Sequence, residues 1–256
     1  MEFDSIWFGL LVAAAFAGFV DAVAGGGGLI QVPALMAGLP QQAPATLFGT
    51  NKLASIFGTL NAARRYLREV DMNWAIAVPV AVSAFFFSFA GAAVVVWLPK
   101  EVVRPLVLVL LVAVAVYTWL KPDFGRQQGA SRIQGRQVLP VAILAGALLG
   151  FYDGFFGPGA GSFMIFAFVR LFGMDFLHAS ATAKIVNAST NAGAILLFAP
   201  TGHMLWVLGF GMAACNIAGA QLGARMAIRH GSGFVRAVFL VMTTLLIAKI
   251  GWDTLA

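Results

Sequence analysis

Two aspartates and two lysines occupy matching places in the two halves of the chain. Asp21 ends one apolar segment and Lys52 lies within a later one, and Asp153 and Lys184 follow them at an offset of 132 residues. Charged residues make up only 10% of the chain, so a shared offset for both types favours internal duplication over chance. The same offset relates further pairs: Gly25 and Gly157, Thr50 and Thr182, Trp74 and Trp206, and Arg104 and Arg236.

A cluster of glycines follows each aspartate and interrupts the apolar pattern. Such clusters free backbone N–H groups from helical hydrogen bonds, which a membrane tolerates only where the backbone is buried in protein or lines a watery cavity. Amides at the start of the next short helix carry partial positive charge, which suits an anion. Close helix packing through small residues is the alternative interpretation. The glycines that we predict to bind a ligand are Gly25, Gly26, Gly27, Gly28, Gly157, Gly159 and Gly161.

Each lysine begins a polar stripe on an otherwise apolar helix. Ser180, Lys184, Asn187 and Asn191 share one helical face, and Phe48, Lys52, Ser55 and Thr59 form the matching face of the first half. A lysine within an apolar helix is costly and functional by default, so the pattern predicts an anion held by ammonium, amide and hydroxyl groups. The alternative is that each lysine reaches an interface or pairs with an aspartate. Outside the glycine clusters, the predicted ligands are Thr50, Asn51, Lys52, Ser55, Thr182, Lys184, Asn187 and Asn191.

The two aspartates need a partner, because the dipole at a helix C-terminus opposes a carboxylate. An ion pair with Lys52 or Lys184 would fix the broken segment, and this is the interpretation that we favour for Asp21 and Asp153. The alternative is a proton site, since burial favours the neutral acid and a bare carboxylate would repel an anion.

Other kinds of chemistry find no support in the sequence. The single Cys215 and the scattered histidines show no metal-ligand spacing, and no Ser/His/Asp grouping stands out. The glycine clusters lack the Gly-Lys-Ser/Thr ending of a nucleotide-binding P-loop. We therefore expect no enzyme activity, no metal and no cofactor.

The composition indicates an integral membrane protein. The 256 residues are 61% apolar, whereas a soluble domain carries about 25% charged residues. The net charge of +6 comes from basic residues near helix ends, which is typical of membrane topology and not of nucleic-acid binding. Apolar runs long enough to approach a full span lie near 5–24, 73–98, 102–120, 138–156, 203–228 and 234–252.

We predict an all-α polytopic membrane protein with two homologous halves, 1–120 and 138–256, joined by a cytoplasmic linker at 121–137. Each half has four long helices and one short, glycine-broken or re-entrant element, at 29–37 and 162–172. The other helices are expected at 46–66 and 178–199 and over the long apolar runs. Three basic clusters fall on one side of the membrane if the halves are inverted repeats. These clusters are Arg64, Arg65 and Arg68, the linker, and Arg225, Arg229 and Arg236.

The first-half motif resembles the TauE/SafE family of membrane transporters. The resemblance rests on Asp21 followed by four glycines, on Pro33 and Pro40, and on the run Gly49-Thr50-Asn51-Lys52. It covers nearly the whole chain, although the second half reads Gly157-Pro158-Gly159-Ala160-Gly161 and Ala181-Thr182-Ala183-Lys184 and has no proline at 165. The resemblance implies transport of sulfur-containing anions, such as sulfite or organosulfonates, across the inner membrane.

These observations predict a secondary transporter that exports small anions by alternating access at a site between the two glycine-broken helices. A passive anion channel is the alternative, and a membrane-embedded enzyme or assembly partner is a third reading from another class. The expected partners are a small anion, the lipid bilayer and protons or another coupling ion. The sequence leaves open the exact substrate, the direction of transport, the coupling ion and whether the protein forms a homo-oligomer.

Overall fold

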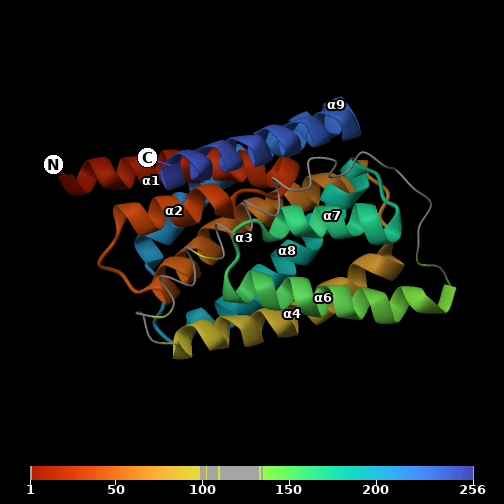
Figure 1. Ribbon diagram of the computed structural model, residues 1–256, viewed down its shortest axis with the longest axis horizontal. Coiled ribbons are helices and arrows are strands. Elements are labelled where there is room, and N and C mark those ends of the chain that lie inside the picture. The colour runs from red at the N-terminus through yellow and green to blue at the C-terminus, as the bar shows by residue number, and fades with distance from the viewer. Residues whose placement is uncertain (1, 99–101, 103–108, 110–132, 134, 256) are drawn as a thin grey trace.

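The computed structural model describes residues 2–98, 102, 109, 133 and 135–255. Every regular element among these residues is helical, as predicted (Figure 1). The predicted helix at 102–120 and the predicted linker at 121–137 lie outside the described residues, apart from 102, 109, 133 and 135–137. The elements are α1 (Glu2–Ala24), α2 (Gly28–Gly38), α3 (Pro44–Glu69), α4 (Trp74–Trp97), the short 3₁₀ helix η1 (Gly135–Gln137), α6 (Val138–Phe155), α7 (Ala160–Phe172), α8 (Phe176–Phe198) and α9 (Trp206–Leu255).

Four of the described helices are long and apolar enough to cross a membrane. They cover Ser5–Ala24, Trp74–Trp97, Gly135–Phe155 and Trp206–Val238. Helix α9 is interrupted at Gly231, whose positive φ of 69° breaks the helix between the two segments that the sequence predicts at 203–228 and 234–252. Large apolar side chains are exposed on the outward faces of these helices, which is the pattern expected of surfaces that contact lipid; examples are Phe8, Phe86, Leu148 and Val207.

The two short helices are the glycine-broken elements. With 11 and 13 residues, α2 and α7 are about 17 and 20 Å long at 1.5 Å per residue, whereas the hydrocarbon core of a bilayer is about 30 Å thick. Positive φ angles at Gly25, Gly157 and Gly159 end the preceding helices and turn the chain into the short ones. Each short helix therefore begins inside the protein (Figure 1).

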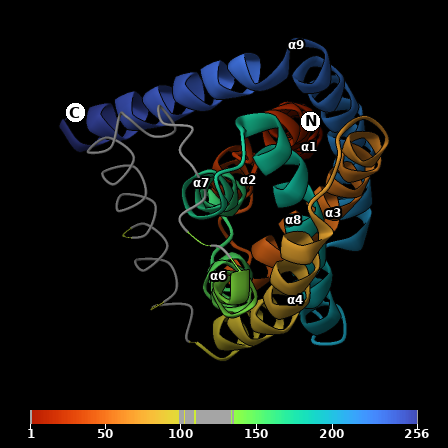
Figure 2. The same ribbon diagram turned by 90° about the vertical axis from the view of Figure 1, so that its right-hand side faces the viewer.

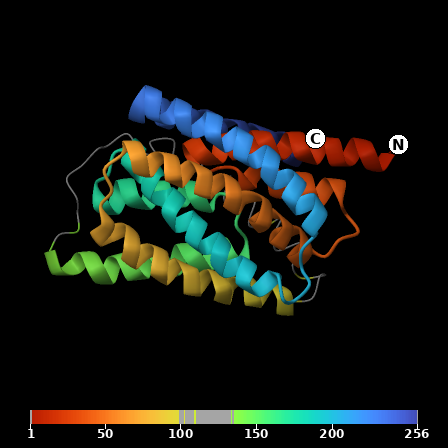
Figure 3. The same ribbon diagram turned by 180° about the vertical axis from the view of Figure 1, so that it is seen from behind.

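Helices α3 and α8 lie between two pairs of long apolar helices, α1 with α9 and α4 with α6 (Figures 2 and 3). The most extensive contacts join α1 to α9 and α4 to α6. Glycines allow both pairs to touch along their backbones: a Cβ on Gly219 would lie 1.8 Å from the Ala15 oxygen, and one on Gly154 would lie 2.0 Å from the Ser88 oxygen. When the two halves are exchanged by the 132-residue offset, each of these helix pairs maps onto the other.

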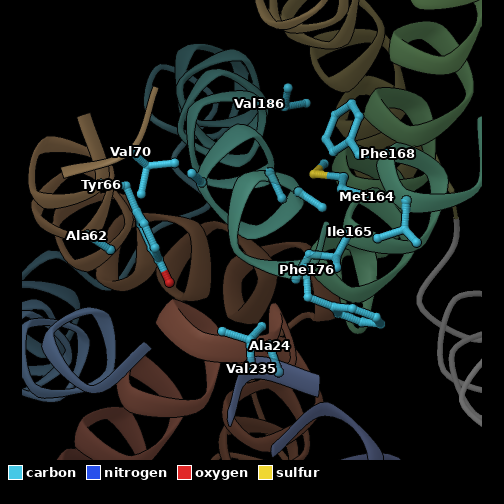
Figure 4. Close-up of a cluster of buried hydrophobic side chains, with 14 of the residues drawn as sticks. Ala24, Ala62, Tyr66, Val70, Met164, Ile165, Phe168, Phe176, Val186 and Val235 are labelled. Atoms are coloured by element: carbon cyan, nitrogen blue, oxygen red, sulfur yellow. The ribbon is translucent and has the colours of Figure 1, made fainter. Parts of the chain in front are cut away.

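An apolar cluster packs α7 against α3, α8 and the end of α1 (Figure 4). Its largest fully buried members are Tyr66, Phe168, Met164 and Ile165. The cluster holds the short helix α7 in place, and polar residues of α3 and α8 are buried as well. The interior of the protein thus combines apolar packing with buried polar and charged side chains.

Asp175 caps the start of α8 in the short loop that follows α7. Its Oδ1 accepts hydrogen bonds from the backbone N–H groups of Leu177 and His178, at 2.8 and 3.1 Å, and from the hydroxyl of Ser232 in α9, at 2.7 Å. Burial acts to raise the pKa of Asp175, but hydrogen bonds from Ser232 and from the backbone and ring of His178 outweigh it and hold the pKa below its ordinary value. The cap therefore ties α8 to the second segment of α9.

Candidate functional site

The two glycine clusters meet backbone to backbone at the centre of the protein. A Cβ on Gly25 would lie 2.2 Å from the carbonyl carbon of Gly161, and one on Gly161 would lie 2.6 Å from the Gly25 oxygen. A Cβ on Gly28 would lie 3.2 Å from the Cα of Pro158. Only glycine fits at the first two positions, and the N-termini of α2 and α7 are thereby brought together from opposite halves of the chain.

The broken end of α1 is satisfied by side chains from three other helices. The last carbonyls of a helix have no partner within it, and in a membrane they must find one elsewhere in the protein. The oxygen of Ala22 accepts from Tyr66, that of Val23 from Ser180, and that of Ala24 from Ser162; the distances are 3.0, 3.1 and 2.8 Å. The oxygen of Asp21 accepts from the Lys184 ammonium. The break in α1 is therefore a built feature with its backbone groups paired.

Each lysine pairs with the aspartate of the opposite half. Lys52 Nζ lies 2.6 Å from Asp153 Oδ1, and Lys184 Nζ lies 2.8 Å from Asp21 Oδ2. The Lys52 and Asp153 side chains are each 3% exposed, and that of Lys184 is 0% exposed. Two cross-half ion pairs thus join α3 to α6 and α8 to α1, and the four ionised groups together carry no net charge.

The two aspartates differ in how completely they are enclosed. Both carboxylate oxygens of Asp153 are occupied, since Lys52 binds Oδ1 and the Thr190 hydroxyl donates to Oδ2. The Asp21 side chain is 16% exposed, and its Oδ2 accepts from Lys184 and, at 3.5 Å, from Thr59. Within the described part of the chain, no hydrogen-bond donor reaches Asp21 Oδ1. We call Lys52–Asp153 the sealed pair, because both carboxylate oxygens have donors, and Lys184–Asp21 the open pair, because Asp21 Oδ1 has none among the described residues.

A central cavity lies between the glycine turns and the polar stripes of α3 and α8. Its volume is about 20 Å³, which is room for about one water molecule. Both aspartates line it together with many of the residues predicted from the sequence: Gly25, Gly28, Asn51, Lys52, Ser55, Gly157, Gly161, Asn187 and Asn191. The lining offers amide, hydroxyl, ammonium and carboxylate groups, so it suits a small polar or charged solute.

Other predicted ligands lie outside the central cavity. The predicted residues that do not line it are Gly26, Gly27, Thr50, Gly159, Thr182 and Lys184. Gly27 packs against α1, where a Cβ would lie 2.6 Å from Asp21 Cβ, and Gly159 precedes α7 with a φ of 79°. The Thr50 hydroxyl donates to the Thr46 oxygen at 2.7 Å and accepts from the Leu205 N–H at 3.0 Å, which ties α3 to the start of α9.

Thr182 and Lys184 also have local partners. The Thr182 hydroxyl donates to the His178 oxygen of its own helix at 2.9 Å. Lys184 lies behind Asp21, and its ammonium contacts both the carboxylate and the main-chain oxygen of that residue. Neither of these two side chains lines the central cavity.

Sequence reasoning missed Thr190 and the partnering of the two asparagines. Thr190 donates to Asp153, yet its counterpart at the 132-residue offset is Gly58, so the repeat gives no signal for it. Asn191 Nδ2 donates to Asn187 Oδ1 at 2.9 Å, while the buried Asn51 Oδ1 has no hydrogen-bond partner among the described residues. The signal in the sequence that could have led to Thr190 is the polar stripe with Asn187 and Asn191, because Thr190 lies between them in the same helix.

Comparison with known proteins places the chain among membrane transporters. The family model described as "Sulfite exporter TauE/SafE" matches residues 10–250. The chain is 36% identical over 245 residues to the probable membrane transporter protein YfcA of Escherichia coli K12, with 96% of this chain and 89% of that protein covered. It is 37% identical over 238 residues to a probable membrane transporter protein of Haemophilus influenzae, covering 93% and 91% of the two chains. No solved structure matches the chain.

Proposed function

We propose a mechanism from one premise: the chain belongs to the TauE/SafE sulfite exporter family and is a membrane transporter. In this proposal it is a secondary transporter that exports small anions, namely sulfur-containing ones such as sulfite or organosulfonates, across the inner membrane. The observation that carries the proposal is the central cavity, where the starts of α2 and α7 meet two cross-half ion pairs.

Backbone dipoles support an anionic substrate. Gly28 is the first residue of α2 and Gly161 is the second residue of α7, and both line the central cavity. Helix N-termini carry partial positive charge and free N–H groups, so two of them at one place favour a small anion. The Lys52 ammonium also lines the cavity. A bound anion would contact this ammonium while it stays paired with Asp153. The proposed substrate contacts are the predicted ligands that line the cavity.

The arrangement of the helices supports inverted halves and alternating access. In Figure 1, α1 runs away from the N-terminal label while its counterpart α6 runs the opposite way. The equivalent packing of α1 on α9 and of α6 on α4 fits two structural repeats that exchange partners. Transporters built in this way place their substrate at discontinuous helices between the repeats and rock one repeat against the other. Because each ion pair joins residues of opposite halves, such rocking would change the distance between its lysine and its aspartate.

Counterflow in proteoliposomes tests the proposal. Vesicles loaded with unlabelled sulfite should take up labelled sulfite transiently, and competition by thiosulfate, sulfonates, sulfate and short carboxylates defines the substrate class. Lys52→Ala should abolish counterflow, whereas Arg68→Ala, which removes an exposed cation near the end of the same helix, should not. Voltage-driven current without counterflow would instead identify a channel. Folded protein that shows neither would refute anion transport.

A further inference from the structure

We propose that Asp21 is the proton-binding residue of this transporter and that one proton accompanies each monovalent anion. The inference rests on the proposed function, because it assigns the coupling ion to the same cavity. It is carried by the difference between the two ion pairs, which are alike in sequence and unlike in their surroundings.

The charge of the site favours a proton as partner for the anion. The charges of Asp21, Asp153, Lys52 and Lys184 sum to zero, so these side chains offer a monovalent anion no net charge, and only the partial charges at the starts of α2 and α7 balance it. An unpaired charge is costly inside a membrane. A proton on one carboxylate removes this cost, since the four groups then carry a net charge of +1 that matches the anion.

Hydrogen bonding decides which carboxylate accepts the proton. Lys184 contacts both the Asp21 carboxylate and the Asp21 main-chain oxygen, so it keeps an acceptor when the carboxylate becomes neutral. Lys52 has Asp153 Oδ1 as its only hydrogen-bond acceptor within the described residues. Protonation of Asp153 would leave the buried Lys52 ammonium with one neutral acceptor, the remaining carboxyl oxygen, whereas protonation of Asp21 would leave Lys184 with two acceptors.

Access points to the same residue. Asp21 Oδ1 has no donor among the described residues, the side chain is 16% exposed, and the residue lines the central cavity. Asp153 is 3% exposed and both its oxygens are occupied. A proton can therefore reach Asp21 from the water that enters the cavity without breaking an existing hydrogen bond.

The titratable groups near Asp21 are few. Lys184 from α8 contacts it directly, and Lys52 from α3 and Asp153 from α6 line the same cavity. Tyr66 from α3 donates to the neighbouring Ala22 oxygen. The residues of α2 and α7 that line the cavity are glycines, and no described residue of α9 lines it. Within the described part of the chain, Asp21 and Asp153 are thus the carboxylates that line the cavity.

The step is a reversible proton transfer. A hydronium ion at the open side of the transporter gives its proton to Asp21 Oδ1 and leaves as water, and the anion binds beside Lys52. On the opposite side the anion leaves and Asp21 returns the proton to water. Charge and protons balance, so the proton and the anion move in the same direction. Export then follows the anion gradient of the cell, and an imposed pH gradient drives accumulation of the anion towards the alkaline side.

The test uses methanesulfonate, because this anion of a strong acid carries no proton of its own. In proteoliposomes that are acidic outside and alkaline inside, the wild-type protein should accumulate labelled methanesulfonate, and addition of a protonophore should abolish the accumulation. Under weak buffering in detergent, binding should take up about one proton per anion. Asp21→Asn should lose accumulation driven by the pH gradient and should take up no proton when methanesulfonate binds.

The outcomes are separable from those of the proposed function. Counterflow in the wild type without any effect of the pH gradient would overturn the proton assignment while anion transport stands. Accumulation that follows a sodium gradient instead would also overturn it. Absence of counterflow for every anion refutes the proposed function itself. Asp153→Asn serves as the matched variant, and a selective loss of proton coupling in that variant, with coupling intact in Asp21→Asn, would reverse the assignment.

Discussion

Removal of the Lys52 ammonium should destabilise the fold more than removal of the Lys184 ammonium. Lys52→Met retains most of the side-chain volume and leaves Asp153 as a buried carboxylate whose remaining hydrogen-bond donor, among the described residues, is Thr190. Because Asp153 is 3% exposed and Asp21 is 16% exposed, water in the central cavity replaces the lost partner less readily at Asp153. Lys184→Met leaves Asp21, which is 16% exposed and lines the central cavity, where water can hydrate the carboxylate or a proton can neutralise it.

The expected magnitudes follow from burial. Loss of one partner from a buried ion pair costs about 3–5 kcal/mol, so Lys52→Met should lie in this range. Lys184→Met should cost roughly 1–3 kcal/mol, as is usual when a partly accessible group loses a contact. The double variant Lys52→Met with Asp153→Asn removes both charges and should recover about 2 kcal/mol relative to Lys52→Met, which is within the range of couplings between residues in contact.

The free energy of unfolding in mixed detergent micelles measures these differences, and Arg68→Met provides a control at an exposed position of the same helix. The control should change stability by about 0.5 kcal/mol or less. Equal costs for the two lysine variants would contradict the distinction between a sealed and an open pair. A double variant no more stable than Lys52→Met alone would show that the ion pair is not the source of the loss.

Three further changes probe other contacts. Gly161→Ala places a Cβ 2.6 Å from the Gly25 oxygen, so it should cost about 1–3 kcal/mol of stability and slow anion counterflow, as measured by thermal unfolding and vesicle assays. Thr190→Val removes the hydroxyl that serves Asp153 without changing the shape, and a loss of about 1.5–3 kcal/mol is expected in the same unfolding assay. Asp175→Ala removes the cap of α8 and should cost about 0.5–2 kcal/mol at neutral pH. Because the folded pKa of Asp175 is lowered, its contribution is present above the unfolded pKa of about 3.9 and is lost as the pH falls through the folded value, so wild type and variant should converge in acid.

Helix positions were accessible from the sequence because the breaks in this chain are local. Glycines with positive φ end α1 at Gly25 and divide α9 at Gly231, and both breaks fall where the apolar runs predict them. The short lengths of α2 and α7 followed from the distance between glycine clusters and polar turns. Such features depend on residues next to each other in the chain, so periodicity and turn chemistry are sufficient to find them.

The pairing of charges was not accessible in the same way. Lys52 and Asp153 are 101 positions apart, and Lys184 and Asp21 are 163 apart, so the choice of partner depends on how α3 and α8 cross the ends of α6 and α1. A single sequence shows that each half contains one acid and one base. It does not show that the partners are exchanged between halves, because that is decided by the packing of helices from opposite ends of the chain.

The polar stripe of α8 illustrates how a correct helix face can still mislead about a site. Ser180 and Asn191 share that face but lie about 17 Å apart along the helix axis at 1.5 Å per residue. Asn187 and Asn191 therefore line the central cavity, while Ser180 and Lys184 reach the broken end of α1. On α3, by contrast, the lysine itself lines the cavity. The lysines of the two motifs therefore have different roles: Lys52 lines the central cavity, whereas Lys184 binds the end of α1. With exact symmetry the two aspartates would be equally enclosed, but here Asp21 is more exposed than Asp153.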